Sequence, residues 1–138
     1  MECFKTFRKA PPSQLIMTLL VKNEESMLEE NLLFHKAMGV DSFIITDNNS
    51  TDSTPEIIRK YKQKGWIKEV IEEKATDYEQ KEWVDRMIWK AKTIYKADWI
   101  INADADELWY SPSGNLKTDL SATHANVLNC EMRSVYPE

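Results

Sequence analysis

The chain has 138 residues, enough for one domain with a hydrophobic core, and we expect a single domain over residues 1–138. Eighteen basic and 23 acidic residues give a formal net charge of −5, which argues against a nucleic-acid-binding surface. The longest aliphatic-rich run, residues 15–21, is far shorter than the roughly 20 residues that cross a bilayer. These properties exclude a membrane-spanning protein and a nucleic-acid-binding protein as first hypotheses.

Two further features bear on the cellular compartment. The first 12 residues are polar and basic, unlike a signal peptide. The two cysteines, Cys3 and Cys130, are far apart and form no C-x-x-C motif, which favours a reducing compartment. We therefore expect a cytoplasmic protein without a transmembrane segment. A peripheral position at the inner face of the membrane is also compatible with these features.

Predicted strands and helices alternate along the chain. Residues 1–13, which contain two prolines, are expected to be an irregular lead-in. Apolar runs predict strands over residues 15–21, 41–46, 66–71, 99–101 and 126–136. Apolar spacings of three and four residues predict helices over residues 26–38, 54–64 and 78–96. The apolar stripe of the last helix is expected to pack in the core; its members are Trp83, Met87, Ile88, Ala91 and Tyr95.

This alternation predicts an α/β fold with a mostly parallel sheet and right-handed crossovers. In such folds the fourth strand is usually added beside the first, and ligands bind at the carboxyl ends of the strands near that point. We therefore expect three polar segments to lie together at one edge of the sheet. They are the turn after residue 21, the loop after residue 46 and the acidic stretch after residue 101.

The acidic stretch contains Asp104, Asp106 and Glu107 directly after a buried apolar run. Side chains two positions apart in an extended segment point to the same side, so the two aspartates can converge. Carboxylates held that close repel each other unless one is protonated or a cation lies between them. An all-oxygen site suits Mg²⁺ or Mn²⁺, especially when a diphosphate completes the coordination. The alternative is an acidic, solvent-exposed turn, and the expected convergence of three polar segments favours the metal site.

Other site types find less support. The turn after the first strand reads K-N-E-E and lacks the glycines of a dinucleotide-binding motif or a P-loop, so a bound diphosphate would need a metal. His35 and His124 do not have the spacing of a metal pair, and we expect each to be structural or solvent-facing. The D-x-D spacing also occurs in haloacid-dehalogenase phosphatases. There it follows the first strand and precedes Thr or Val, whereas Glu and Leu follow it here.

These features occur in three segments, and the order and spacing of the segments are as informative as their sequences. They read L-L-V-K-N-E-E (residues 19–25), I-I-T-D-N-N-S-T-D-S-T (residues 44–54) and A-D-W-I-I-N-A-D-A-D-E-L (residues 97–108). Together they resemble the N-terminal, nucleotide-binding half of a GT-A glycosyltransferase of family 2 type, in the branch whose metal motif reads D-x-D-E. The resemblance implies a Rossmann-like (GT-A) three-layer αβα sandwich that is incomplete at its C-terminus. Asn48-Asn49 departs from the family's more usual aspartate–glycine pair, which leaves the loop geometry and the base preference open.

The resemblance also implies roles for individual residues. Asn23 and Glu24 would border the nucleotide base and ribose, and Asp47 would contact the base. Asp104 would approach the ribose and the metal, and Asp106 would be the principal ligand of Mn²⁺ or Mg²⁺ on the donor diphosphate.

Some of these positions have simpler explanations. Arg86 is a further candidate for a diphosphate or base contact, and an ion pair with Glu82 one turn earlier is as plausible. For Asp47 a turn role is as plausible as a base contact, and for Asp52 turn or capping chemistry is favoured.

By this resemblance the protein transfers a sugar from a UDP- or GDP-sugar to a hydroxyl of a glycan or lipid-linked acceptor, and a metal stabilises the departing diphosphate. An inverting enzyme of this type needs a carboxylate base, which the family supplies from its C-terminal half. We therefore expect the catalytic base to lie outside this chain, which would stop before the acceptor half. The second hypothesis is a non-catalytic nucleotide-sugar or metal-binding module that a partner chain completes.

Overall fold

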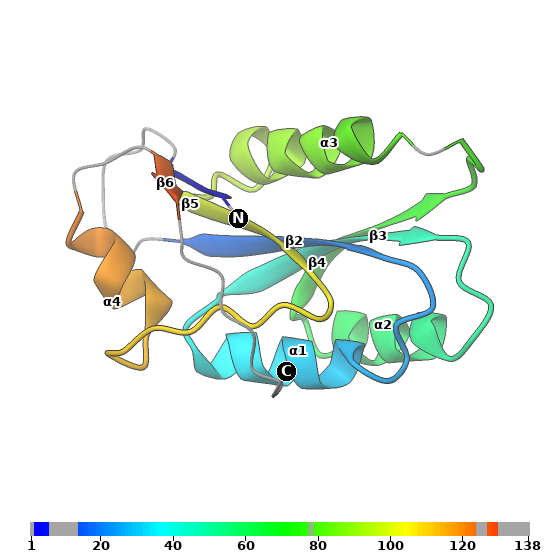
Figure 1. The fold of residues 1–138 in the computed structure, drawn as a ribbon, viewed down its shortest axis with the longest axis horizontal. Coiled ribbons are helices and arrows are strands. Elements are labelled where there is room, and N and C mark those ends of the chain that lie inside the picture. Colours follow the sequence, from blue (N-terminus) through cyan, green and yellow to red (C-terminus); the bar gives the residue numbers. More distant parts are fainter. Residues whose placement is uncertain (1, 6–13, 78, 124–126, 130–138) are drawn as a thin grey trace, which may run out of the picture.

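The computed structural model describes residues 2–5, 14–77, 79–123 and 127–129. It is a three-layer α/β sandwich in which one sheet lies between α3 on one face and α1 and α2 on the other (Figure 1). The helices are α1 (Leu28–Ala37), α2 (Thr54–Gln63), α3 (Gln80–Thr93) and α4 (Leu116–Ser121). The strands are β1 (Glu2–Lys5), β2 (Leu15–Val21), β3 (Ser42–Asn48), β4 (Ile67–Glu73), β5 (Trp99–Asp104) and β6 (Val127–Asn129).

The strand order is β4-β3-β2-β5-β1-β6. The four strands from β4 to β5 are parallel, and β5 lies directly beside β2. The predicted α/β class and the predicted placement of the fourth parallel strand beside the first are therefore confirmed. This order creates a topological switch point between the carboxyl ends of β2 and β5, where open α/β sheets bind their ligands.

The structure corrects the prediction for the chain's start. Residues 2–5 are not an irregular lead-in but strand β1, which pairs antiparallel with β5 and places Cys3 opposite Ile101. Four residues are too few to show a two-residue alternation, so their strand character comes from the exposed edge of β5. Helix α4, which Asn115 caps through its side chain, was also not predicted. Of the strand predicted over residues 126–136, residues 127–129 form β6 and the others lie outside the described residues.

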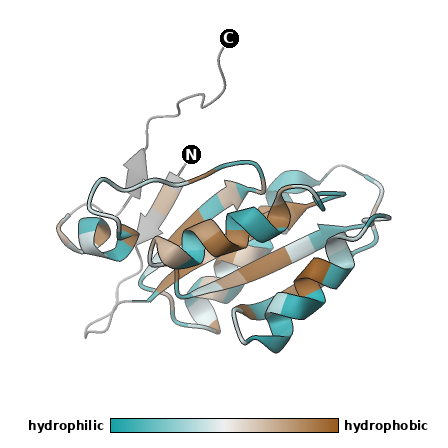
Figure 2. Cartoon of the chain, turned by 90° about the horizontal axis from the view of Figure 1, so that it is seen from below, coloured by the Kyte–Doolittle hydropathy of each residue, from teal (hydrophilic) through white to brown (hydrophobic). Residues whose placement is uncertain are grey.

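Each face of the sheet has its own hydrophobic core. Figure 2 shows hydrophobic residues along the central strands and on the helices that cover them. Odd-numbered residues of β2, among them Leu15, Met17 and Leu19, pack with α1 and α2. The even-numbered Ile16 packs instead with α3. This alternation is a property of every extended strand, and it decides which residues at the carboxyl edge point to which layer. No helix among the described residues is long and apolar enough to cross a membrane.

Candidate metal and nucleotide site

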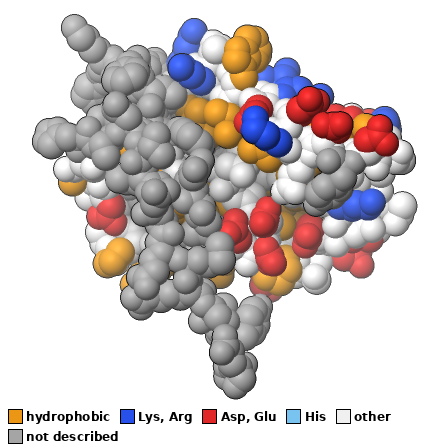
Figure 3. Space-filling model, turned by 45° about the horizontal axis from the view of Figure 1, so that its top comes forward, with side chains coloured by type: hydrophobic (Ala, Val, Ile, Leu, Met, Phe, Trp, Pro, Cys, Tyr) orange, Lys and Arg blue, Asp and Glu red, His pale blue; other side chains and the backbone are white. Residues whose placement is uncertain are grey.

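A pocket of about 420 Å³ lies at the carboxyl ends of β2, β3 and β5, on the side of the sheet that α3 covers. The three polar segments of the sequence therefore do meet, as expected from the strand order. Acidic side chains gather beside apolar ones on the face that Figure 3 shows. The pocket is lined by Leu20, Val21, Lys22, Glu24, Asn48, Gln80, Trp83, Asp104, Ala105 and Asp106.

Glu24, Asp104 and Asp106 are the predicted site residues that line this pocket. Asn23, Asp47 and Arg86 are not among the lining residues. Each of these three makes other contacts in the structure, which explain its position.

Strand alternation separates Asp47 from Asn48. Strand β3 continues to residue 48, two residues beyond its predicted end, so these neighbours point to opposite faces of the sheet. Asn48 lines the pocket, and its side-chain NH₂ donates to the carbonyls of Glu73 and Ala75. Asp47 instead accepts the backbone N–H of Ser50 through Oδ1, which is the turn role that the sequence left open. The side chain that β3 presents to the pocket is therefore the amide of Asn48.

Asn23 connects the turn after β2 with the loop after β3. Its Oδ1 accepts the backbone N–H of Thr51 at 2.7 Å, and its own N–H donates to Ser50 Oγ at 2.9 Å. The residue has φ = 52°, a left-handed conformation that asparagine tolerates better than most residues. Its side chain thus fixes the relative position of two loops, and Glu24 next to it faces the pocket.

Asp52 and Thr54 complete this connection. Asp52 accepts the backbone N–H of Thr54 at 2.8 Å and that of Glu25 at 3.2 Å, in line with the turn and capping chemistry favoured for it. The Thr54 hydroxyl accepts the backbone N–H of Glu24 at 2.8 Å. The backbone beneath Glu24 is therefore fixed by the loop that precedes α2.

Arg86 lies on α3 and pairs with Glu73 at the end of β4, at 2.6 Å. The alternative pairing with Glu82 was wrong, because the arginine reaches across to the sheet instead of along its own helix. This contact holds the pKa of Glu73 below its usual value. It ties α3 to the strand whose carbonyl at Glu73 also orients Asn48.

Two buried side chains of α1 bind the backbone of the acidic loop, residues 104–109. Asn31 donates to the carbonyls of Ala105 and Glu107, both at 2.9 Å, and more weakly to that of Asp104 at 3.4 Å. His35 bonds Asn31 through Nδ1 and accepts the backbone N–H of Trp109 through Nε2 at 2.8 Å. Burial lowers the pKa of His35 to about 4, so the ring is neutral at pH 7. The structural role expected for His35 agrees with these contacts, whereas His124 lies outside the described residues.

The carboxylates that face the pocket have no such hydrogen-bond partners among the described residues. Partial burial raises the pKa of Asp104, and the charge of Asp106 raises it further. Burial also raises the pKa of Glu24, with added repulsion from Asp106, Asp104 and Asp52. Of the described residues that line the pocket, Lys22 alone carries a positive charge. The site therefore concentrates negative charge that a cation would stabilise.

This donor set fits Mg²⁺ or Mn²⁺ in its chemistry. All three carboxylates supply hard oxygen ligands. Within the described residues, no three His, Cys, Asp or Glu side chains already form a metal-binding cluster. Mg²⁺ commonly uses one or two protein carboxylates and completes its coordination with substrate phosphates and water, so a ready-made protein cage is not required.

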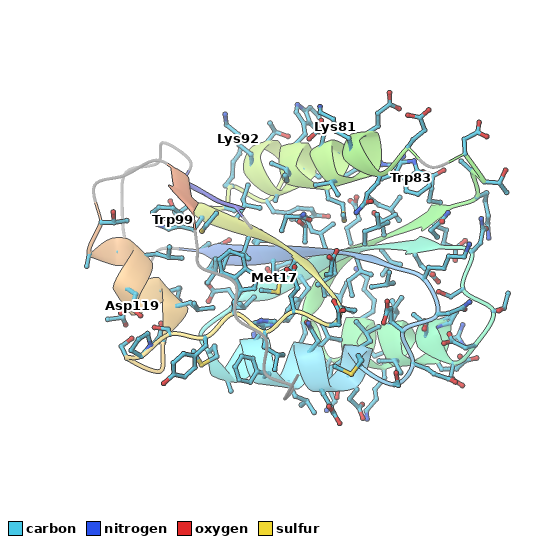
Figure 4. All side chains as sticks on the ribbon, viewed as in Figure 1. Met17, Lys81, Trp83, Lys92, Trp99 and Asp119 are labelled. Atoms are coloured by element: carbon cyan, nitrogen blue, oxygen red, sulfur yellow. The ribbon has the colours of Figure 1, made fainter. Side chains whose placement is uncertain are left out.

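Trp83 is a pocket residue that the sequence pattern assigned to the core. Met87 and Ala91 do belong to the core under α3, and Ile88 and Tyr95 pack against it. Trp83, at the N-terminal end of the helix, is 5% exposed and lines the pocket. It lies between α3 and the sheet in Figure 4. The apolar stripe of a helix does not show which of its residues face the core and which face a pocket. Only the structure, in which Trp83 lines the pocket together with the end of β2, shows that it belongs to the pocket wall.

Solved structures support the fold. S. aureus TarS 1–349, determined in complex with UDP, matches with a TM-score of 0.62 and 18% sequence identity, over 79% of this chain and 31% of the TarS 1–349 chain. The mannosyltransferase PcManGT from Pyrobaculum calidifontis, in complex with GDP-Man and Mn²⁺, matches with a TM-score of 0.51 and 20% identity, over 71% of this chain and 29% of that protein. The chain thus spans about a third of the length of these structures.

No curated protein matches the chain in sequence. The sequence profile of glycosyltransferase family 92 matches residues 17–129, which include all the segments that form the pocket. This match covers most of the chain. The protein belongs to glycosyltransferase family 92.

Proposed function

We propose that this chain binds the nucleoside-diphosphate sugar donor of a glycosyl transfer reaction, together with Mn²⁺ or Mg²⁺, as a member of the D-x-D-E branch. The observation that carries the proposal is the pocket at the switch point, where Glu24, Asp104 and Asp106 bring uncompensated carboxylates together. Family membership and the UDP and GDP-Man complexes of two structural neighbours support the same reaction class.

Asp104 and Asp106 would hold the metal, and the metal would stabilise the negative charge on the departing diphosphate. Lys22 lines the same pocket and would approach the diphosphate from the turn after β2. Without a cation, a pocket of three carboxylates would repel a diphosphate, so donor binding should depend on the metal.

The nucleotide base would bind beside Asn48, with the exposed edge of Trp83 as part of the apolar wall of the pocket. Both NH₂ hydrogens of Asn48 are directed to the carbonyls of Glu73 and Ala75, so its carbonyl oxygen is the group left to accept an N–H from uracil or guanine. We therefore propose Asn48 for the base contact that the resemblance had suggested for Asp47.

We assign no catalytic base. A carboxylate base near the acceptor is expected from a part of the enzyme other than the donor pocket. The acceptor, a glycan or lipid-linked hydroxyl, would bind on the open side of the pocket.

The test is calorimetric titration of UDP and GDP into the chain, with and without Mn²⁺, beside Asp106→Asn. We expect binding of one nucleotide that requires Mn²⁺ and that weakens at least about 100-fold in the variant, because one of two protein ligands is lost. Asp85→Asn is the matched control, since Asp85 is an exposed carboxylate on α3 that pairs with Lys81 outside the pocket. Equal binding by Asp106→Asn and wild type, or no nucleotide binding by the folded chain, would overturn the proposal.

A further inference from the structure

Asn31 and His35 form a buried polar chain between α1 and the acidic loop. Asn31 is 1% exposed and His35 is fully buried. Buried polar groups are costly unless their hydrogen bonds are satisfied, and two apolar residues would pack α1 against the sheet at least as well. The presence of an amide and an imidazole here therefore points to a need for directed hydrogen bonds.

The hydrogen bonds fix the orientation of both side chains. His35 Nε2 accepts the N–H of Trp109, so the ring proton resides on Nδ1 and is donated to Asn31 Oδ1. The Asn31 amide must then present its NH₂ to the loop carbonyls, which it does at Ala105 and Glu107. The opposite amide orientation would place an oxygen against these carbonyls and an NH₂ against the imidazole N–H.

These contacts replace the ladder hydrogen bonds that end with β5 at Asp104. Beyond that residue, no strand among the described residues pairs with the loop backbone. Asn31 and His35 contact the loop on the α1 side at Ala105, Glu107 and Trp109, on both sides of Asp106. The Glu107 side chain adds a contact within the loop, since its Oε1 accepts the Asp104 N–H at 2.8 Å.

We propose that Asn31 and His35 are positioning residues of the donor site, which hold the loop so that Asp104 and Asp106 face the pocket before the metal binds. The proposal rests on the proposed function. Both groups are neutral, so they order the loop without cancelling the negative charge that would attract the metal. A lysine or arginine in the place of Asn31 would give similar hydrogen bonds and would weaken the site for a cation.

The test compares Asn31→Leu, which keeps similar volume and removes the donors, with Leu32→Ala on the same helix. Leu32 is fully buried in the core and is absent from the hydrogen bonds to the loop. The measurement is Mn²⁺ affinity at saturating UDP, from the electron paramagnetic resonance signal of unbound Mn²⁺, on protein shown to be folded. We expect Asn31→Leu to weaken Mn²⁺ binding about 10- to 100-fold, as loss of an outer-shell partner does. Leu32→Ala should lower Tm and leave the Mn²⁺ affinity unchanged.

Equal Mn²⁺ affinity in Asn31→Leu and wild type would overturn the positioning role, and so would an equal loss in both variants. A wild-type chain that binds no Mn²⁺–UDP would instead overturn the proposed function. A nitrogen NMR spectrum of the wild-type imidazole gives a second test that needs no variant. It should show the proton of His35 on Nδ1, and a proton on Nε2 would contradict the hydrogen-bond chain to Trp109.

Discussion

The two sides of the acidic loop differ in how their polar groups are satisfied. On the α1 side, backbone carbonyls and an N–H of the loop meet Asn31 and His35 at hydrogen-bond distance. On the α3 side, Glu24, Asp104 and Asp106 face one pocket, and mutual repulsion adds to burial in raising the pKa of Glu24 and Asp104. The loop is thus ordered from one side by neutral groups and strained electrostatically on the other. In the proposed roles, this combination holds the loop in place and leaves the charge of its carboxylates for a metal ion.

The largest effect is expected from protonation of His35, which would disrupt the hydrogen bonds on the α1 side of the loop. Its pKa is about 4 in the folded chain and 6.5 in the reference state. The unfolded chain therefore takes up the proton first, and the stability from neutral His35 is complete above pH 6.5 and lost as the pH falls towards 4. The shift corresponds to roughly 3 kcal/mol of unfolding free energy.

Urea unfolding of wild type and His35→Gln between pH 7 and 4 checks this prediction. Glu24, Asp104 and Glu107 have raised pKa values and act in the opposite direction, because they take up protons in the folded state first. The difference between the two proteins isolates His35, and wild type should lose more stability than the variant on acidification. Parallel pH profiles would contradict a neutral, buried His35.

A smaller effect is expected at Trp83, on the pocket wall that α3 provides. Trp83→Leu removes the aromatic surface and keeps an apolar residue at the end of α3. We expect nucleotide affinity to fall about tenfold, because the shorter side chain removes packing contacts from the pocket wall beside the base. Trp89→Leu is the control, because Trp89 is 58% exposed on the same helix and is not a lining residue. Calorimetry with UDP and Mn²⁺ measures both, and equal affinities would remove Trp83 from the base site.

The smallest effect tests the repulsion between the carboxylates on the α3 side of the loop. Asp104→Asn removes one of the repelling carboxylates with little change in shape, so it should raise Tm at pH 7 by about 1–3 °C while it weakens metal binding. Because the folded pKa of Asp104 is raised, the gain should shrink as acid protonates the wild-type carboxylate. Differential scanning calorimetry at pH 7 and pH 4 measures this, with Asp85→Asn as the control. A lower Tm at pH 7 would show that the charges in the pocket are already balanced.

The strand order and the carboxyl-edge location of Asp104 and Asp106 were predictable, because both follow from alternating apolar and polar runs. That Asn48 and not Asp47 lines the pocket was not predictable, because it depends on β3 continuing to residue 48 and on the face to which each residue then points. Strand β1 depends on pairing with β5, which is distant in sequence. The partners of Arg86 and Asn31 are likewise tertiary contacts: Glu73 lies 13 residues away and the acidic loop more than 70.

The most direct measurement of the central claim is amide hydrogen exchange of residues 104–109 with and without Mn²⁺ and UDP. If Asn31 and His35 order the loop, the Trp109 amide is already protected in the absence of metal, and Mn²⁺ with UDP adds little protection. In Asn31→Leu the same amide should exchange fast until Mn²⁺ and UDP are added. Fast exchange of the wild-type loop that becomes slow only with the metal would contradict the account, because the metal and not α1 would then build the site.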